Sequence, residues 1–231
     1  MSGTSTARFR LREHGLSIAF AVIFLAALVG QSFAGLAAYN EDQIAHHAAT
    51  VGWLDFVTSS DFVVDVAENW QSEYLQFFLF IFATIWLVQK GSPESKKVGD
   101  EGLGTDEEQL VHEYARPESP AWAKVRGFRH TLYSNSLLLV MGAIFLASWL
   151  VQSLAGQVSY NQDQLEHGQE LVSWGGYLVS ADFWNRTLQN WQSEFLAVGS
   201  MIAFSIFLRQ RGSSESKPVG TPHHETATEA E

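Results

Sequence analysis

Two glutamates, Glu73 and Glu194, close identical Asn-Trp-Gln-Ser-Glu motifs, and each motif precedes an apolar segment. An ionisable side chain inside a bilayer costs a few kcal/mol unless it is paired or faces water. Two ionised carboxylates in equivalent places would also repel, which raises the apparent pKa of at least one of them. The pair therefore indicates a site that binds a proton or a small cation.

Other polar residues are expected at the same depth as these two carboxylates. Counted from the charged inner ends of the apolar segments, the glutamates and two glutamines lie 15 residues inward, or about 22 Å at 1.5 Å per residue. Serines and asparagines adjoin them. The expected intramembrane polar layer comprises Gln31, Glu73, Gln152, Glu194, Ser72, Ser193, Asn69 and Asn190.

Two alternatives to a proton or cation site stay open for this layer. Glutamine, serine and protonated glutamate can hydrogen-bond across helices, so that the layer only fixes their packing. The two glutamates can also extend their carboxylates to the outer interface, with their methylene groups left in the apolar region.

A second set of residues has the spacing of a metal site. Asp42 and His46 are four residues apart, as are Asp163 and His167, so each pair shares a helical face. Imidazole and carboxylate groups are ligands for divalent metals. The simpler interpretation, which we prefer, is two solvated Asp/His pairs near a membrane surface, with no cofactor.

Composition and motifs exclude several functional classes. The chain has no cysteine, so it carries neither disulfides nor thiolate ligands, and its net charge of −11 disfavours nucleic acid as a partner. We find no glycine-rich phosphate loop, nucleophile elbow or HExxH motif. We therefore expect a protein that is not an enzyme.

Four apolar segments are candidates for crossing a membrane. Residues 16–39 and 137–160 each run for 24 positions without a charge, and about 20 suffice. Two shorter segments must extend into the Asn-Trp-Gln-Ser-Glu motifs, which gives spans of about 70–89 and 191–210. A cleaved signal peptide is the alternative for the first segment, but a similar run recurs in mid-chain.

The chain is a tandem duplication. A shift of 121 residues aligns residues 8–99 with 129–220 without a gap, and more than a third of the aligned positions are identical. Each copy contains two apolar segments, so both copies have the same orientation and form parallel repeats. Ser59 or Ser60, and Ser180 in the second copy, are expected N-caps of the second helix of each repeat.

The distribution of basic residues predicts the orientation of the chain. Arg186 is the only lysine or arginine in residues 40–69 and 161–190. The other ends of the spans are rich in both, which by the positive-inside rule places them in the cytoplasm. These basic residues include Arg8, Arg10, Arg12, Lys90, Lys96, Lys97, Lys124, Arg126, Arg129, Arg209, Arg211 and Lys217.

The predicted domain organisation follows from these boundaries. A cytoplasmic arm (1–15) precedes repeat 1 (16–90), whose outer segment is 40–69. A largely disordered cytoplasmic linker (91–128), rich in Gly, Ser, Glu and Asp, leads to repeat 2 (129–211), whose outer segment is 161–190. A disordered cytoplasmic tail (212–231) follows.

The motifs also carry a resemblance. The Asn-Trp-Gln-Ser-Glu-Tyr/Phe-Leu motif and the run from Gln31 to His46 resemble those of uncharacterised bacterial multipass membrane proteins, classed as a domain of unknown function. The resemblance covers nearly the whole chain outside the linker and tail. It implies a location in the bacterial inner membrane, and it transfers no activity and no functional residues.

Together these observations predict an all-α, four-helix integral membrane protein built from two tandem parallel two-helix repeats, with both termini cytoplasmic. Its expected partners are the lipid bilayer, a proton or small cation, and further copies of itself or another membrane protein. The alternative function is structural or regulatory, with a polar layer that only packs helices and with the linker and tail as docking segments.

Overall fold

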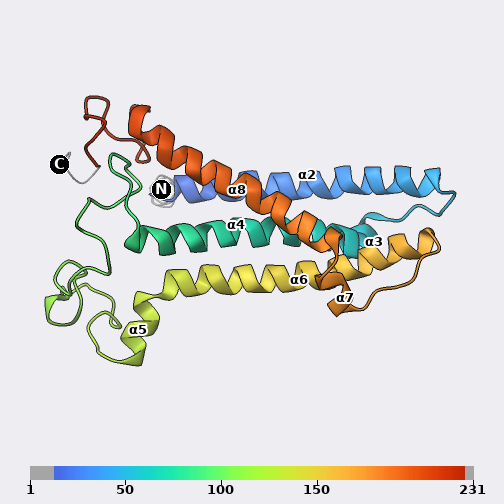
Figure 1. Ribbon diagram of the computed structural model, residues 1–231, viewed down its shortest axis with the longest axis horizontal. Helices are drawn as coiled ribbons and strands as arrows, with labels where there is room; N and C mark the ends of the chain where they lie inside the picture. Colours follow the sequence, from blue (N-terminus) through green and yellow to red (C-terminus); the bar gives the residue numbers. More distant parts are fainter. Residues whose placement is uncertain (1–12, 227–231) are drawn as a thin grey trace, which may run out of the picture. The chain divides into compact units, whose positions relative to one another are not determined.

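The computed structural model describes residues 13–226, and every regular element in that range is helical (Figure 1). Arg8, Arg10, Arg12 and most of the predicted N-terminal arm lie outside the described residues, as does the end of the tail. In order, the elements are α2 (Gly15–Ala45), α3 (Trp53–Val57), α4 (Ser60–Trp86), the 3-10 helix η1 (His112–Tyr114), α5 (Phe128–Ser134), α6 (Ser136–Glu166), α7 (Trp174–Leu178) and α8 (Ala181–Phe207).

Helix lengths recur along the chain in the same order as the sequence repeat. Helices α2 and α6 have 31 residues, α3 and α7 have 5, and α4 and α8 have 27. The expected N-caps are confirmed, because Ser180 Oγ accepts from the Phe183 N–H and Ser59 Oγ from the Phe62 N–H. The equivalent halves of the sequence therefore adopt equivalent secondary structure.

Helices α2 and α6 are long and apolar enough to cross a membrane. Their most apolar 18-residue windows have mean hydropathies of 2.2 and 2.1, and only 6% and 17% of those windows are buried. A core helix of a water-soluble protein would bury far more of such a sequence. By length and composition the two helices thus meet the requirements of a membrane span.

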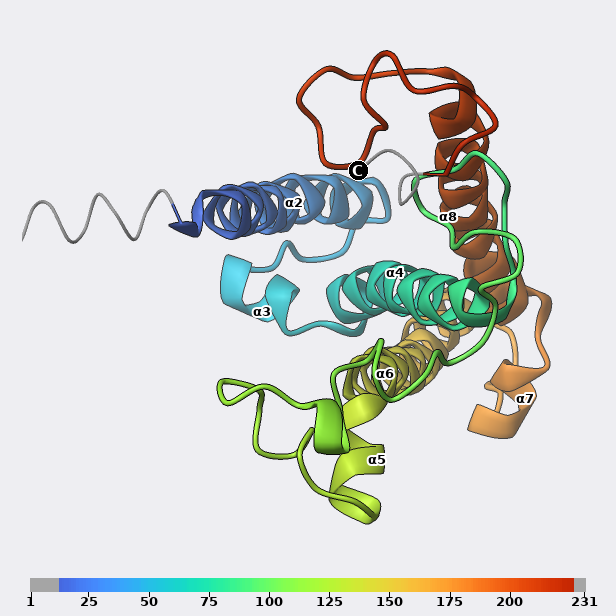
Figure 2. The same ribbon diagram turned by 90° about the vertical axis from the view of Figure 1, so that its left-hand side faces the viewer.

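The chain divides into two compact units, residues 1–65 and 66–231. The first contains α2, α3 and the first turns of α4. The second contains the rest of α4 with α5, α6, α7 and α8 (Figure 2).

Within each unit, a serine and an asparagine of the long helix hold the segment that follows it. In the second unit the Trp174 indole N–H donates to Ser153 Oγ (3.1 Å), and the Asn161 amide bonds both the N–H and the C=O of Val172 (2.9 and 3.0 Å). The first unit repeats this with Trp53 on Ser32 (3.0 Å), and with Asn40 on Val51 (2.8 and 3.1 Å). These repeated motif residues therefore fold the outer segment back onto its own helix.

A glycine in the same motif lets an aromatic ring lie against the long helix. A Cβ on Gly156 would stand 2.4 Å from Tyr177 Oη, and one on Gly35 would stand 2.8 Å from Phe56 Cζ. The Tyr177 side chain is fully buried and also packs against the rings of Tyr160 and Phe183. The ring cannot move aside, so only glycine fits at these positions.

A second hydrogen-bonding pattern that both repeats share follows the C-terminal ends of α4 and α8. Ser95 Oγ accepts from the Gln89 N–H (2.7 Å), and Ser216 Oγ accepts from the Gln210 N–H (2.9 Å). The lysine after each serine turns back onto carbonyls of its own loop. Lys96 donates to the Gly102 carbonyl, and Lys217, which is buried, donates to three carbonyls, those of Pro222 (3.2 Å), His223 (3.2 Å) and Glu225 (2.8 Å).

The two serine-lysine loops, residues 91–102 and 212–223, also meet each other in the second unit. Glu94 and Glu215, which occupy equivalent positions in the repeat, hydrogen-bond through their carboxyl groups. Burial, followed by the charge of Glu215, raises the pKa of Glu94 above its ordinary value. Ser92 Oγ lies 3.4 Å from Ser205 Oγ on α8, so one loop also contacts the helix that precedes the other.

The remainder of the linker contains turns, η1 and local polar contacts. His112 Nδ1 lies 2.9 Å from Asp106 Oδ2, and Arg126 Nη2 lies 2.9 Å from Glu113 Oε2. The disorder expected for the linker and the tail stays a prediction from composition.

We expect Gly156→Ala to destabilise the protein. The added methyl group would clash with the buried Tyr177 ring, at a cost of about 1–3 kcal/mol for overpacking, which exceeds the gain of up to about 1 kcal/mol from replacing a helical glycine. Thermal unfolding of the purified protein measures the change. The matched control is Gly199→Ala on α8, where a new Cβ meets nothing within 4 Å and stability should hold or rise. Equal effects of the two variants would contradict this account.

Candidate functional site

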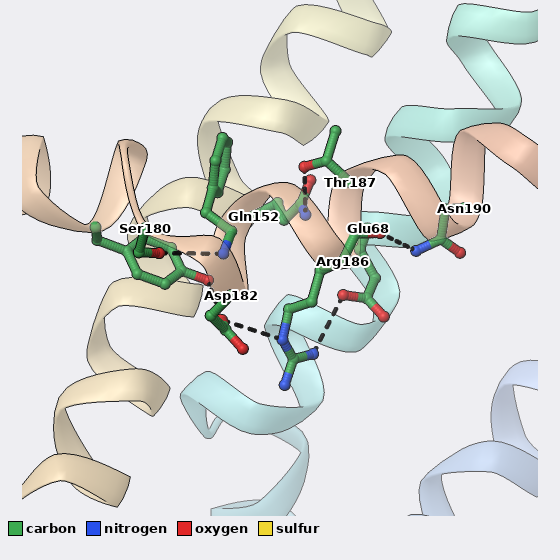
Figure 3. Close-up of polar contacts among 9 residues, drawn as sticks. Glu68, Gln152, Ser180, Asp182, Arg186, Thr187 and Asn190 are labelled. Carbon is green, nitrogen blue, oxygen red and sulfur yellow. Dashed lines mark hydrogen bonds and ion pairs between the residues drawn. The ribbon is translucent and has the colours of Figure 1, made fainter.

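Four polar residues at intervals of four follow one face of α8. Asp182, Arg186, Asn190 and Glu194 form this stripe, which runs from the first turn of the helix to the motif glutamate. Arg186 Nε lies 3.5 Å from Asp182 Oδ2, and Asn190 Nδ2 donates to the Arg186 carbonyl (2.9 Å). The stripe thus forms a connected series of polar groups over its first two turns (Figure 3).

Arg186 also joins α8 to α4. Its Nη1 lies 3.2 Å from Glu68 Oε2, so one guanidinium group bridges two carboxylates (Figure 3). The Glu68 side chain is 16% exposed and that of Arg186 is 34% exposed. Burial alone would lower the pKa of Arg186, but the carboxylates of Glu68 and Asp182 more than offset it and raise that pKa. The cation is therefore held firmly in its charged form.

Tyr177 completes this charged cluster from α7. Its hydroxyl donates to Asp182 Oδ2 at 3.1 Å. Burial of the ring, followed by the negative charge of Asp182, raises the pKa of Tyr177 well above its ordinary value. Tyr177 is consequently a permanent hydrogen-bond donor and takes no part in proton release near neutral pH.

Two buried glutamines cross-link the three long helices of the second unit. Gln152 on α6 donates from Nε2 to Thr187 Oγ1 on α8 (3.3 Å), and Gln71 on α4 accepts from the Trp191 indole N–H (2.8 Å). Each amide keeps one buried atom without a partner, Oε1 of Gln152 and Nε2 of Gln71. Such atoms cost about 1–3 kcal/mol each and would gain from a bound water or ion.

One glutamate of the predicted layer lies within range of the charge of the other. The charge of Glu73 on α4 acts directly on the carboxyl group of Glu194 on α8. Glu73 is exposed and Glu194 is half-buried. These two equivalent carboxyl groups on α4 and α8 therefore lie within electrostatic range.

The other predicted layer residues are placed differently from one another. Ser72 and Ser193 donate to the backbone carbonyls three residues earlier, Asn69 O and Asn190 O, both at 2.9 Å. Asn69 is exposed on α4. Gln31 is exposed on α2 in the first unit, and Gln152 bonds Thr187 with no glutamate as its partner.

The Asp/His pairs each form a local contact. His46 Nδ1 lies 3.0 Å from the backbone carbonyl of Asp42, and His167 Nδ1 lies 2.7 Å from that of Asp163. Within residues 13–226, no group of three or more histidine and acidic side chains is arranged to hold a metal ion. A metal there stays a prediction from spacing alone.

Sequence reasoning did not identify four residues of this site: Glu68, Gln71, Tyr177 and Thr187. For Arg186 a signal existed, because it is the only basic residue in the outer segments and its equivalent in repeat 1 is Asp65. A position that changes from acid to base between two copies marks a place where the copies have different partners. Glu68, whose equivalent is Gln189, is the partner that this comparison could have suggested.

Comparison with known proteins gives one match. The sequence model of a protein family, described as a domain of unknown function (DUF6766), matches residues 7–228. No curated protein and no solved structure matches the chain.

We expect the Glu68–Arg186 ion pair to contribute about 1 kcal/mol to stability, since both groups are only partly exposed. A double-mutant cycle with Glu68→Gln and Arg186→Gln, followed by thermal unfolding, measures the coupling. The same cycle on Glu113 and Arg126, an exposed pair in the linker, is the control and should give less coupling. Additive effects at Glu68 and Arg186 would show that the pair does not hold α4 to α8.

Proposed function

The chain belongs to this family of unknown function, so no activity can be transferred from relatives, and we propose one from its own residues. The protein is an integral protein of the bacterial plasma membrane, with four spans in two parallel two-helix repeats and cytoplasmic termini. The apolar surfaces of α2 and α6, the recurrent helix lengths and the one-sided distribution of lysine and arginine support this architecture. Helices α4 and α8 supply the other two spans through residues 70–89 and 191–210.

Labelling of single cysteines tests this topology directly, because the chain has no cysteine of its own. A membrane-impermeant maleimide should label Thr50→Cys and Gln169→Cys in intact cells, since both exposed positions lie in the outer segments. Glu118→Cys and Ser214→Cys, exposed in the linker and tail, should react only after permeabilisation. Labelling of Glu118→Cys in intact cells would reverse or disprove the proposed orientation.

The proposed function is the binding or permeation of a proton or a small cation at Glu73 and Glu194. The observation that carries it is that the charge of Glu73 acts on Glu194, whose carboxyl group occupies the equivalent position of the other repeat. In a bilayer two such groups cannot both stay ionised without a bound cation or a shared proton. Either occupant removes the repulsion, so occupancy of the site follows pH or cation concentration.

The surroundings of the pair add to this proposal. The stripe of Asp182, Arg186 and Asn190 leads along α8 from its outer end toward Glu194. The unpartnered amide oxygen of Gln152 is the kind of ligand that hydrated small cations accept. A cation that enters at the outer end of α8 would pass Arg186 first, and the positive charge of Arg186 would slow it. A proton is therefore the better-matched ligand.

A structural role is the second candidate, and specific contacts favour it. The Gln152–Thr187 and Trp191–Gln71 hydrogen bonds join helices without reference to any ligand. In that case the polar groups only fix helix packing, and the protein acts through partners that bind its linker or tail. Further copies of the chain or another membrane protein are the expected partners, and neither candidate function includes a catalytic step.

Proton and cation flux in proteoliposomes separates the two candidates. With a pH-sensitive dye inside and a panel of cations outside, the wild type should show flux that the Glu73→Gln, Glu194→Gln variant has lost. Glutamine still hydrogen-bonds but cannot ionise, so a packing role would survive the change. We expect the double variant to keep its thermal stability.

The matched control removes two acids elsewhere. Glu41→Gln with Glu166→Gln changes two exposed residues near the ends of α2 and α6 and should leave flux unaltered. Wild-type protein that conducts no more than empty liposomes, for protons and for every cation tried, would refute permeation. Unchanged stability of the double variant would then agree with the structural role, because glutamine still hydrogen-bonds in place of each glutamate.

A further inference from the structure

A cavity of about 320 Å³ lies within the second unit, between α6, α7 and α8. Its volume is in the range of small-molecule sites. Three of its wall residues are tryptophans, and no wall residue is charged. The wall includes Leu146, Trp149, Ser153, Trp174, Phe183 and Trp184.

Trp149 is the centre of this wall. Its indole ring lies 5.6 Å from the ring of Phe145, 6.1 Å from those of Phe183 and Trp191, and 6.3 Å from that of Trp184. These rings hold it from several sides, so the cavity has a rigid aromatic side.

The polar atoms of the wall are almost all committed to the protein. Trp174 donates to Ser153 Oγ, which itself donates to the Leu150 carbonyl, and Trp184 donates to the Leu178 carbonyl. The Trp149 N–H has no partner, but it is fully buried and so does not face the cavity. A charged or multiply hydroxylated ligand would lose its hydration here without replacement. An apolar ligand fits.

The depth of the cavity indicates where such a ligand comes from. Along the span 137–160, Leu146 and Ser153 lie about 14 and 24 Å above the inner end, at 1.5 Å per residue. In a hydrocarbon core about 30 Å thick, this is the outer half. Acyl chains of outer-leaflet lipids occupy that depth, and their ester carbonyls lie above it.

The two repeats differ at the residues that form the aromatic wall. Trp149 and Trp184 correspond to Leu28 and Val63 in repeat 1, while Ser153, Trp174 and Phe183 correspond to identical residues. The scaffold is thus common to both copies, and the two additional indoles belong to repeat 2. The aromatic wall is therefore specific to repeat 2, whereas the packing residues are common to both repeats.

We propose that this cavity binds one acyl chain of an outer-leaflet phospholipid, which packs against the indoles of Trp149, Trp174 and Trp184. The inference goes beyond the carboxylate pair. It rests on the proposed membrane placement, which the cysteine labelling tests separately, and not on permeation. The acyl chain inserts along α6. Its contacts with the indoles distinguish it from the lipids that cover the outside of the helices.

Photolabelling of the full chain in detergent tests the site. The probe is phosphatidylcholine with a diazirine in one acyl chain, titrated with and without unlabelled phosphatidylcholine. Trypsin cleavage after Arg129 and Arg186 isolates residues 130–186, which hold the whole wall. We expect saturable labelling of this peptide that the unlabelled lipid competes away.

A variant that fills the cavity provides the decisive comparison. Leu146→Trp should lower the labelling of residues 130–186 about tenfold at sub-saturating probe, the equivalent of about 1.4 kcal/mol. The matched control is Leu25→Trp, the same substitution at the equivalent position of repeat 1, which should leave that labelling unchanged. Leu150→Phe, with Val29→Phe as its control, fills the same cavity if Leu146→Trp does not fold.

Two outcomes would overturn the proposal. One is labelling that never saturates and spreads over both repeats in proportion to their apolar surface. The other is saturable labelling of residues 130–186 that the folded filling variants leave unaltered, which would place the lipid elsewhere on repeat 2.

Discussion

The bridge from Arg186 to Glu68 and Asp182 is the interaction on which the arrangement of α4 and α8 depends. A half-buried guanidinium needs negative partners, and it finds one on its own helix and one on α4. This fixes the axial register of the two helices in their N-terminal halves. The Trp191–Gln71 hydrogen bond then lies one turn further along, and the charge of Glu73 acts on Glu194.

The duplication separates residues that build the fold from residues that distinguish the copies. The contacts of Trp53 with Ser32 and of Asn40 with Val51 recur as those of Trp174 and Asn161, with nearly the same distances. Such repeated contacts explain why the motif residues are identical in both copies without any ligand. Residues that differ, such as Arg186 opposite Asp65 and Trp149 opposite Leu28, belong to the charged cluster and to the cavity.

The same comparison clarifies the role of the predicted polar layer. Its serines bond their own helices, and its buried glutamine bonds a threonine that the sequence had not singled out. Polar residues at one depth are therefore not one network. The two glutamates are the ionisable residues of the layer. The proposed proton or cation site is therefore confined to them.

By itself the sequence determined the all-α class, the two long apolar helices, the serine N-caps and the family to which the chain belongs. These follow from local chemistry, because hydropathy, helix propensity and capping depend on residues a few positions apart. Only the tertiary structure decided that Arg186 meets Glu68, that Gln71 meets Trp191 and that Trp149 walls a cavity. Such contacts join residues up to 120 positions apart. Their geometry depends on how helices rotate about their axes, which no local pattern specifies.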